Sequence, residues 1–168
     1  MVRPAGPDDC AAIAAIYTRG IEGRTATFEV RPKSAHDIRP WLEDPDRFPV
    51  LVAEEDGAVL GWARVSLYSA VPAYRGVGEL QIYVDPEARG RGVGTDLTEA
   101  TFRAAEQAGY WKVLGKLFPE NEPSRALLSR CGFRDVGLHH RHGRVDGEWR
   151  DVLVVERLLG EAASGYPD

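Results

Sequence analysis

The chain has 168 residues, of which 43% are hydrophobic and 28% are charged, and its formal net charge is -5 at pH 7. This is the composition of a folded globular protein, and the length suffices for one domain with a sizeable core that needs neither a metal nor a disulfide. The acidic balance argues against a nucleic-acid partner, because non-specific binding needs a basic surface to neutralise phosphates.

Two features of the sequence bear on the cellular compartment of the protein: its two cysteines and its first residues. Cys10 and Cys131 show no CxxC or metal-ligand spacing. The first residues, MVRPAGPDDC, lack the apolar core of a secretory signal, and no run of 18 successive apolar residues occurs. We therefore expect a cytoplasmic protein with no membrane partner.

Hydrophobic periodicity and turn residues divide the chain into alternating elements. Asp56-Gly57 and Asp146-Gly147 predict tight hairpin turns. In chain order, the prediction is a strand at 2–4, a helix within 6–23, a loop at 25–34 from which Phe28 dips inward, a helix at 34–44 that Pro40 can break, strands at 49–57, 58–68 and 78–86, a helix at 93–109, a strand at 111–118, a helix at 122–132 and a last hairpin over 133–159.

This order, β-α-α-β-β-β-α-β-α-β-β, predicts an α/β (α+β) fold with a mixed central sheet and helices on both faces. The sequence shows no internal repeat and no linker long enough to separate domains. We therefore predict one domain over residues 1–160, followed by a flexible C-terminal tail over 161–168, where small and polar residues dominate.

The connector EARGRGVGTDL, residues 87–97, lies where a strand is followed by a helix. A helix N-terminus has unpaired amides and about half a positive charge, so it binds anions. Glycines let a phosphate approach these amides, and arginines add charge. The spacing fits neither a dinucleotide-binding GxGxxG motif nor a Walker loop. We expect a pyrophosphate-binding loop of another class, with a plain strand-to-helix turn as the alternative; the residues concerned are Arg89, Gly90, Arg91, Gly92 and Gly94.

The pattern Arg89-x-x-Gly92-x-Gly94 resembles the acetyl-CoA loop of the GNAT N-acetyltransferases. Together with seven other blocks in the same order, it resembles the branch that contains phosphinothricin and arsinothricin N-acetyltransferases. The blocks are ATFE at 26–29, GWA at 61–63, AYRGVGE at 73–79, YV at 83–84, ARGRGVG at 88–94, FPENEPS at 118–124, CGFRDVG at 131–137 and DGEWRDV at 146–152.

The resemblance implies a single-domain GNAT fold with a mostly antiparallel sheet. It also implies transfer of acetyl from acetyl-CoA to the α-amino group of a small amino acid or amino-acid-like antimetabolite, such as phosphinothricin, arsinothricin or methionine sulfoximine, by direct attack of the amine on the thioester. Members of this branch commonly pair, so a homodimer is implied as well.

The resemblance also implies which residues bind the cofactor: the glycine loop, the strand before it, and an Asn-x-x-Ser feature at the next helix. Asn121 would contact the cofactor arm, whereas Ser124 serves the cofactor or caps that helix. The implied set is Ile82, Tyr83, Val84, Arg89, Gly90, Arg91, Gly92, Val93, Gly94, Thr95, Asn121 and Ser124.

Glu79 is the catalytic candidate. Acetyl transfer needs a neutral amine, yet an α-amino group has a pKa of about 8 and is largely protonated at pH 7. Glu79 lies in an otherwise apolar strand and matches the general base of the resembling family. An ordinary glutamate is a weak base, so burial must raise its pKa or a water must relay the proton. The alternative is a strand-end carboxylate that faces solvent or pairs with Arg75. Gly78 predicts either a β-bulge or a need for small size.

The acceptor is the least determined part. In phosphinothricin-type relatives two basic residues precede AY, and Ser69 and Val71 stand there in this chain. The tyrosine that protonates the leaving thiolate in many members aligns with Leu128, so the general acid is unassigned. The substrate-binding residues that the resemblance implies are Phe28, Tyr74 and Arg75.

The run HHRH at 139–142 raises the question of a metal. On a regular strand His140 and His142 share a face while His139 points away, and no acid stands at ligand spacing, so we expect no metal. Two other functions are kept open: a non-catalytic acyl-CoA-binding module, and an acetyltransferase that acts on a protein N-terminus.

Overall fold

The computed structural model describes residues 1–165. Within this range the strands form one seven-stranded sheet in the order β1-β2-β3-β4-β5-β7-β6. Neighbouring strands are antiparallel except β4 and β5, which run parallel. The strands are β1 (Val2–Pro4), β2 (Val50–Glu55), β3 (Ala58–Leu67), β4 (Val77–Val84), β5 (Lys112–Leu117), β6 (Arg134–Val145) and β7 (Glu148–Leu158).

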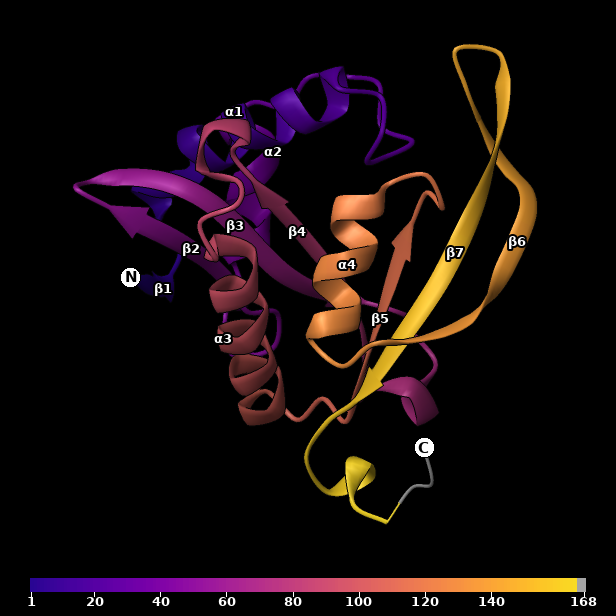
Figure 1. The fold of residues 1–168 in the computed structure, drawn as a ribbon. Helices are drawn as coiled ribbons and strands as arrows, with labels where there is room; N and C mark the ends of the chain where they lie inside the picture. The colour runs from indigo at the N-terminus through magenta and orange to yellow at the C-terminus, as the bar shows by residue number, and fades with distance from the viewer. Residues whose placement is uncertain (166–168) are drawn as a thin grey trace.

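Helices cover both faces of this sheet (Figure 1). The apolar side chains of Ile13, Ile38 and Trp62 pack in one buried cluster, and those of Leu97 and Phe102 pack in a second. The first cluster lies under α1 and α2, and the second under α3 and α4. The predicted mixed sheet, its mostly antiparallel pairing and the element order are thus confirmed; the helices are α1 (Cys10–Glu22), α2 (Ala35–Ile38), α3 (Val93–Gln107) and α4 (Glu122–Arg130).

The two predicted hairpin turns have the backbone that their sequences favour. Asp56 and Gly57 have φ of +50° and +79°, and Asp146 and Gly147 have φ of +52° and +84°. Two successive residues in the left-handed region match the right-handed twist of the flanking strands. Pro40 limits α2 as expected, because the helix ends at Ile38 and a 3₁₀ turn over Arg39–Leu42 follows.

Gly78 does not form a bulge. The pairing of β3 with β4 runs without a break from Gly61 opposite Val84 to Leu67 opposite Gly78. A Cβ added at Gly78 would lie 2.3 Å from Cγ1 of Val65. The bulge prediction is therefore wrong and the small-size alternative is right.

The chain ends after β7 with residues on both sides of the predicted boundary between the domain and its tail over 161–168. Leu159 is buried, and Gly160–Ala163 form a short 3₁₀ turn after β7. Residues 166–168 of the predicted tail lie outside the described residues.

Candidate active site

The sheet opens between its two parallel strands. β4 and β5 pair only from Val77 opposite Lys112 to Glu79 opposite Leu114, although both strands continue beyond these residues. Beyond Glu79, β4 remains paired with β3 and β5 with β7, and the two parallel strands diverge (Figure 1). One side of β4 therefore presents backbone groups that no strand within the described residues pairs.

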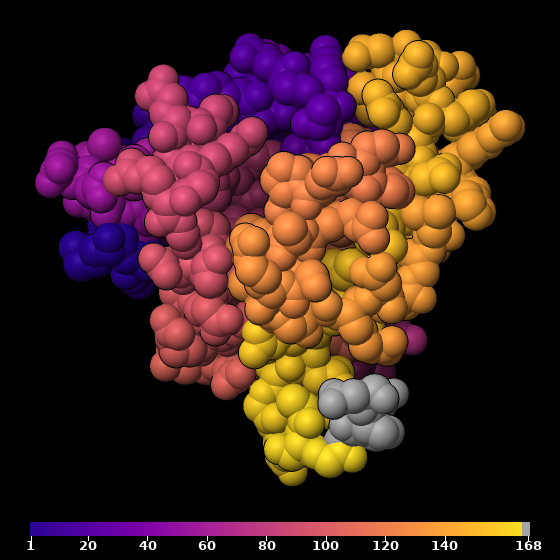
Figure 2. Space-filling view, viewed as in Figure 1, coloured from indigo at the N-terminus to yellow at the C-terminus, as the bar shows by residue number. Residues whose placement is uncertain are grey.

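A cavity of about 600 Å³ occupies this opening. Its walls come from α1, the segment after α1, the two diverging strands, α4 and β6. Figure 2 shows the surface hollowed beside α4, beneath the segment that follows α1. The structure brings six of the expected site residues together in the lining: Phe28, Glu79, Ile82, Tyr83, Asn121 and Ser124.

Glu79 lies where the strands separate, and its partner comes from the other strand. Lys116 Nζ lies 2.7 Å from Glu79 Oε1, and the two side chains are 47% and 28% exposed. The alternative pairing with Arg75 is not seen, since the Arg75 guanidinium lies over the Trp111 ring, 5.6 Å from its centroid. Sequence reasoning missed Lys116. The signal that identified Glu79, a charge inside an apolar strand, applies equally to WKVLGKLF.

The side chains of β4 alternate between the two faces of the sheet. Ile82 and Val84 pack against the cluster under α3 and α4, whereas Tyr83 packs against the cluster under α1 and α2. Burial raises the pKa of Tyr83 well above its ordinary value, so its hydroxyl keeps its proton at neutral pH. That hydroxyl donates to the Ala26 carbonyl over 3.5 Å. Of the three β4 residues implied to bind the cofactor arm, Val84 does not line the cavity.

Gly90 and Gly92 give the predicted anion loop its shape. Their φ values are +74° and +85°, and a Cβ added at either would meet no atom within 4 Å. Glycine is needed there for the backbone and leaves an open cradle in front of α3. The first backbone bond of α3 runs from the Asp96 N–H to the Gly92 carbonyl. The amides of Val93, Gly94 and Thr95 precede Asp96, so they have no acceptor within the helix.

The arginines and the third glycine of this loop have different surroundings. Arg89 is exposed, whereas Arg91 forms an ion pair with Glu55, so part of the positive charge expected at the rim is neutralised. A Cβ added at Gly94 would lie 3.0 Å from Leu127, which lines the cavity. The loop therefore packs against the cavity wall at α4. An open glycine cradle, unpaired amides and an exposed arginine fit a diphosphate.

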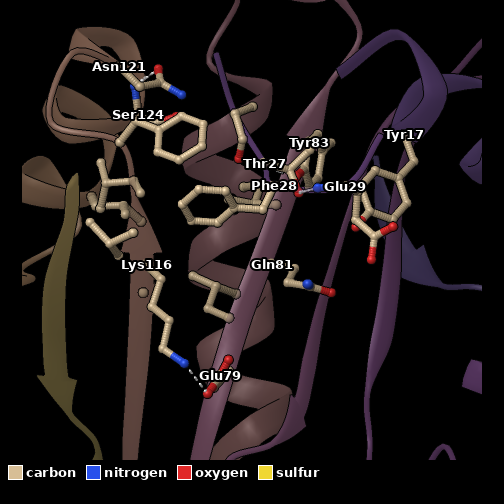
Figure 3. Close-up of a pocket in the computed structure, with 18 of the residues that line it drawn as sticks. Tyr17, Thr27, Phe28, Glu29, Glu79, Gln81, Tyr83, Lys116, Asn121 and Ser124 are labelled. Atoms are coloured by element: carbon tan, nitrogen blue, oxygen red, sulfur yellow. Dashed lines mark hydrogen bonds and ion pairs between the residues drawn. The ribbon is translucent and has the colours of Figure 1, made fainter. Parts of the chain in front are cut away.

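Asn121 has a structural role that sequence reasoning assigned to Ser124. Asn121 is the N-cap of α4, and its Oδ1 accepts the Ser124 backbone N–H over 3.3 Å. Asn121 Nδ2 donates to the Thr25 carbonyl over 3.2 Å, which ties the loop after α1 to α4. Asn121 and Ser124 lie at the opposite end of the cavity from Glu79 and Lys116 (Figure 3). Leu128, on the same helix, is buried and also lines the cavity.

Phe28 forms part of the cavity wall. The sequence predicted that this side chain points inward from its loop. Its ring contacts Phe118 edge to face with 4.9 Å between centroids. A Cβ added at Gly143 would come within 2.4 Å of the Phe28 ring, so the glycine of β6 makes room for it. Phe28 therefore both packs on Phe118 and lines the cavity.

Tyr74 and Arg75 do not reach the cavity. Both are exposed, and Tyr74 contacts Tyr68 edge to face with 5.7 Å between centroids. Ser69 and Val71, which stand where the family has bases, are likewise absent from the lining. The expected substrate-binding residues Tyr74 and Arg75 are therefore not part of the cavity wall.

The histidine run differs from its prediction. The register of β6 against β7 shifts between His139 and Gly143, and Arg141 takes φ of +48°. Asp151 stabilises this bulge by accepting the Arg141 N–H over 2.7 Å. The strict alternation is thereby lost: the rings of His139 and His142 stack at 4.5 Å, and His142 lines the cavity. Strand periodicity could not show this, because a bulge leaves no clear mark in the sequence.

Among residues 1–165, no group of three or more His, Cys, Asp or Glu side chains is arranged to hold a metal ion. No helix in the same range is both long and apolar enough to cross a bilayer.

Comparisons with known proteins agree with this geometry. A family model described as the acetyltransferase (GNAT) family matches residues 12–133. The phosphinothricin N-acetyltransferase of Streptomyces coelicolor is 34% identical over 163 residues, which cover 94% of this chain and 95% of that protein. The L-methionine sulfoximine/L-methionine sulfone acetyltransferase of Pseudomonas aeruginosa is 29% identical over 166 residues, which cover 97% of this chain and 96% of that protein.

A solved structure is similar along the whole chain. It is the crystal structure of a GNAT superfamily phosphinothricin acetyltransferase from Sinorhizobium meliloti in complex with acetyl-CoA. Its TM-score is 0.89 at 30% identity, and the match covers 100% of this chain and 92% of that one. The similarity therefore includes the diverging strands, the glycine loop and the final hairpin.

Proposed function

Because this chain belongs to the acetyltransferase (GNAT) family, we propose that it is an acetyl-CoA-dependent N-acetyltransferase. Its acceptor is the α-amino group of a small amino acid or of an amino-acid-like antimetabolite such as phosphinothricin, methionine sulfoximine or arsinothricin. The observation that supports this proposal most strongly is the extent of the cavity. It reaches from Glu79, where the sheet opens, to α4, which packs against the glycine loop. Relatives named for phosphinothricin and methionine sulfoximine support the acceptor class.

The geometry supports a set of groups that would hold the cofactor. Acetyl-CoA supplies an acetyl group activated as a thioester. The amides of Val93, Gly94 and Thr95 with the Gly90–Gly92 cradle would hold the diphosphate, and the unpaired side of β4 would hold the arm. The path from Glu79 to Asp85 spans six residue-to-residue steps, about 20 Å at the usual strand rise, which is comparable to an extended pantetheine arm.

Glu79 accepts the proton that the acceptor ammonium must lose before its nitrogen attacks, directly or through a water. The acetyl group moves from sulfur to nitrogen, the nitrogen loses its second proton, and the thiolate gains one, so the products are an N-acetyl amino acid and the coenzyme A thiol. Leu128 supplies no proton at the position where many family members have tyrosine, so in this proposal the thiolate takes its proton from solvent.

The test of this function is turnover with a panel of free amino acids, phosphinothricin, arsinothricin and methionine sulfoximine, followed by thiol release. Glu79→Gln should lower kcat at least about 100-fold, the usual size of a general-base contribution, and leave acetyl-CoA affinity within about twofold. Unchanged turnover in Glu79→Gln would remove Glu79 from the mechanism. No turnover of any small amine by the wild-type protein would refute the proposal. It would favour the acyl-CoA-binding module or, if a peptide N-terminus is acetylated, the protein-directed enzyme.

Three further expectations belong to the proposal. A homodimer is supported by the edge position of β6, where Val136 and Leu138 are 50% and 42% exposed, because exposed apolar edges favour pairing between chains. Sedimentation velocity tests the homodimer.

A cytoplasmic location is supported by two free, buried cysteines, which suit a reducing compartment, and cell fractionation tests this location. The division into a domain at 1–160 and a tail at 161–168 predicts that removing the tail leaves the thermal unfolding temperature unchanged.

A further inference from the structure

We infer that Lys116 binds the α-carboxylate of the acceptor, so that the Glu79–Lys116 pair recognises both charges of an amino acid zwitterion. This inference rests on the proposed function and names the group that restricts the acceptor to free α-amino acids.

The inference starts from the position of the pair. Both side chains line the cavity, and Figure 3 shows Lys116 extending from β5 to Glu79 on β4. Lys116 Nζ is 2.7 Å from Glu79 Oε1. An α-amino acid carries an ammonium and a carboxylate on one carbon. Its ammonium can replace Lys116 as the partner of Glu79 while its carboxylate replaces Glu79 as the partner of Lys116. Each charge then exchanges one partner for another, and none is left unpaired.

The pair can separate at little cost. The Lys116 side chain is 47% exposed, so its flexible four-carbon stem is free to shift within the cavity. An ion pair between half-exposed groups contributes little to stability, so opening it does not threaten the fold. The β4–β5 pairing has already ended at Glu79, so no backbone bond between these strands has to break.

The other cations near the site are less suited to the role. Among the described residues that line the cavity, the permanently charged bases are Lys116 and Arg31. Arg31 is 64% exposed and already pairs with Asp37 over 2.8 Å. Arg75 lies over Trp111, outside the lining. Lys116 is thus the permanently charged base of the lining that stands beside Glu79.

Apart from Arg31, the other described polar side chains that line the cavity carry no permanent positive charge. Glu29 is itself acidic and pairs with Lys33 over 2.8 Å. Gln81 is neutral, and its Oε1 accepts from the guanidinium of Arg64 over 2.5 Å. His142 enters the cavity from β6 and stacks on His139. The charge beside Glu79 that can meet an acceptor carboxylate is therefore the Lys116 ammonium.

The inference has a consequence for the acceptor class. Amino acid esters, amides and peptide N-termini keep the α-amine but lack the neighbouring carboxylate. Without it, Lys116 stays on Glu79 and competes with the incoming amine for the same oxygen atoms. Free α-amino acids should therefore be strongly preferred to their carboxamides.

The test compares Lys116→Met with Lys112→Met. Lys112 is a matched control because it lies on β5, pairs with a glutamate, Glu156, and does not line the cavity. For each variant, kcat and KM are measured with the best amino acid of the panel and with its carboxamide. Losing one hydrogen bond between charged groups should raise KM for the free acid about 10- to 100-fold in Lys116→Met and leave the carboxamide within about threefold. Lys112→Met should preserve the wild-type preference for the acid.

Different results overturn different parts. If Lys116→Met lowers kcat equally for acid and carboxamide, Lys116 only positions Glu79 and the inference is wrong. It is also wrong if the wild-type protein acetylates the carboxamide as well as the acid. If the wild-type protein acetylates no small amine at all, the proposed function fails and the inference fails with it. Thermal unfolding and acetyl-CoA titration of each variant show that the fold and the cofactor site persist.

Discussion

Two alanine substitutions, one at each end of α3, test the role of the glycine loop most sharply. Gly92 is the N-cap of α3 and Gly109 follows its C-terminal end, with φ of +85° and +86°. A Cβ added at either position would meet no atom within 4 Å. The steric cost of Gly92→Ala and Gly109→Ala is therefore the same and comes only from the left-handed backbone, about 1–2 kcal/mol for a residue with a side chain. For a chain of this size, this lowers the melting temperature by about 2–8 °C.

Only one of the two substitutions should affect the cofactor. The methyl group of Gly92→Ala enters the cradle in front of the Val93, Gly94 and Thr95 amides, where we place the diphosphate. Losing one amide bond to a charged oxygen costs about 1.5–3 kcal/mol, which corresponds to about 10- to 150-fold in Kd. Gly109→Ala should leave Kd unchanged.

The assay is differential scanning calorimetry of both variants, followed by isothermal titration with acetyl-CoA. We expect matched losses of melting temperature and a loss of affinity in Gly92→Ala alone. Equal affinities for the two variants would refute the placement of the diphosphate. An unchanged melting temperature in both would refute the backbone argument itself.

Three other substitutions test the surrounding structure. Gly78→Ala forces a Cβ to 2.3 Å from Val65 and should cost about 1–3 kcal/mol in urea unfolding; no loss would mean that β3 and β4 can move apart. Arg3 donates to Asp9 and holds the pKa of Asp9 below its ordinary value, so this stabilisation is complete above that value and is lost as pH falls through the lowered one. Asp9→Asn should therefore flatten the fall of unfolding free energy below about pH 4, and equal acid titrations followed by circular dichroism would contradict this. Asn121→Ala removes the cap of α4 and should cost about 1 kcal/mol in urea unfolding, whereas Asn121→Asp, which keeps the capping oxygen but loses the bond to the Thr25 carbonyl, should recover only part of it.

Local chemistry made much of the fold predictable. The Asp-Gly pairs at 56–57 and 146–147 determine their turns because few other residues adopt the left-handed backbone that both positions need. The glycine loop was recognisable for the same reason, since Gly90 and Gly92 have positive φ. Glu79 stood out as a charge within an apolar strand, and it does line the cavity.

Features that depend on distant contacts were not predictable. Lys116 meets Glu79 only because β4 and β5 are parallel neighbours, which the sequence of either strand does not show. Asp151 stabilises the bulge that carries His142 into the cavity, and this contact joins two strands. At Gly78 the sequence allowed two explanations, a bulge or a need for small size. Only the position of Val65 on the neighbouring strand β3 decides between them.

The central claim is that the amides at the start of α3 and the glycines before them bind the diphosphate of coenzyme A. The most direct measurement is isothermal titration of the pure, folded protein with coenzyme A and, separately, with pantetheine, which has the arm without the diphosphate. We predict saturable binding of coenzyme A and binding of pantetheine that is at least about 100-fold weaker, the loss expected when more than one charged hydrogen bond is removed. Equal affinities for the two ligands, or no saturation with coenzyme A at millimolar concentration, would contradict the account.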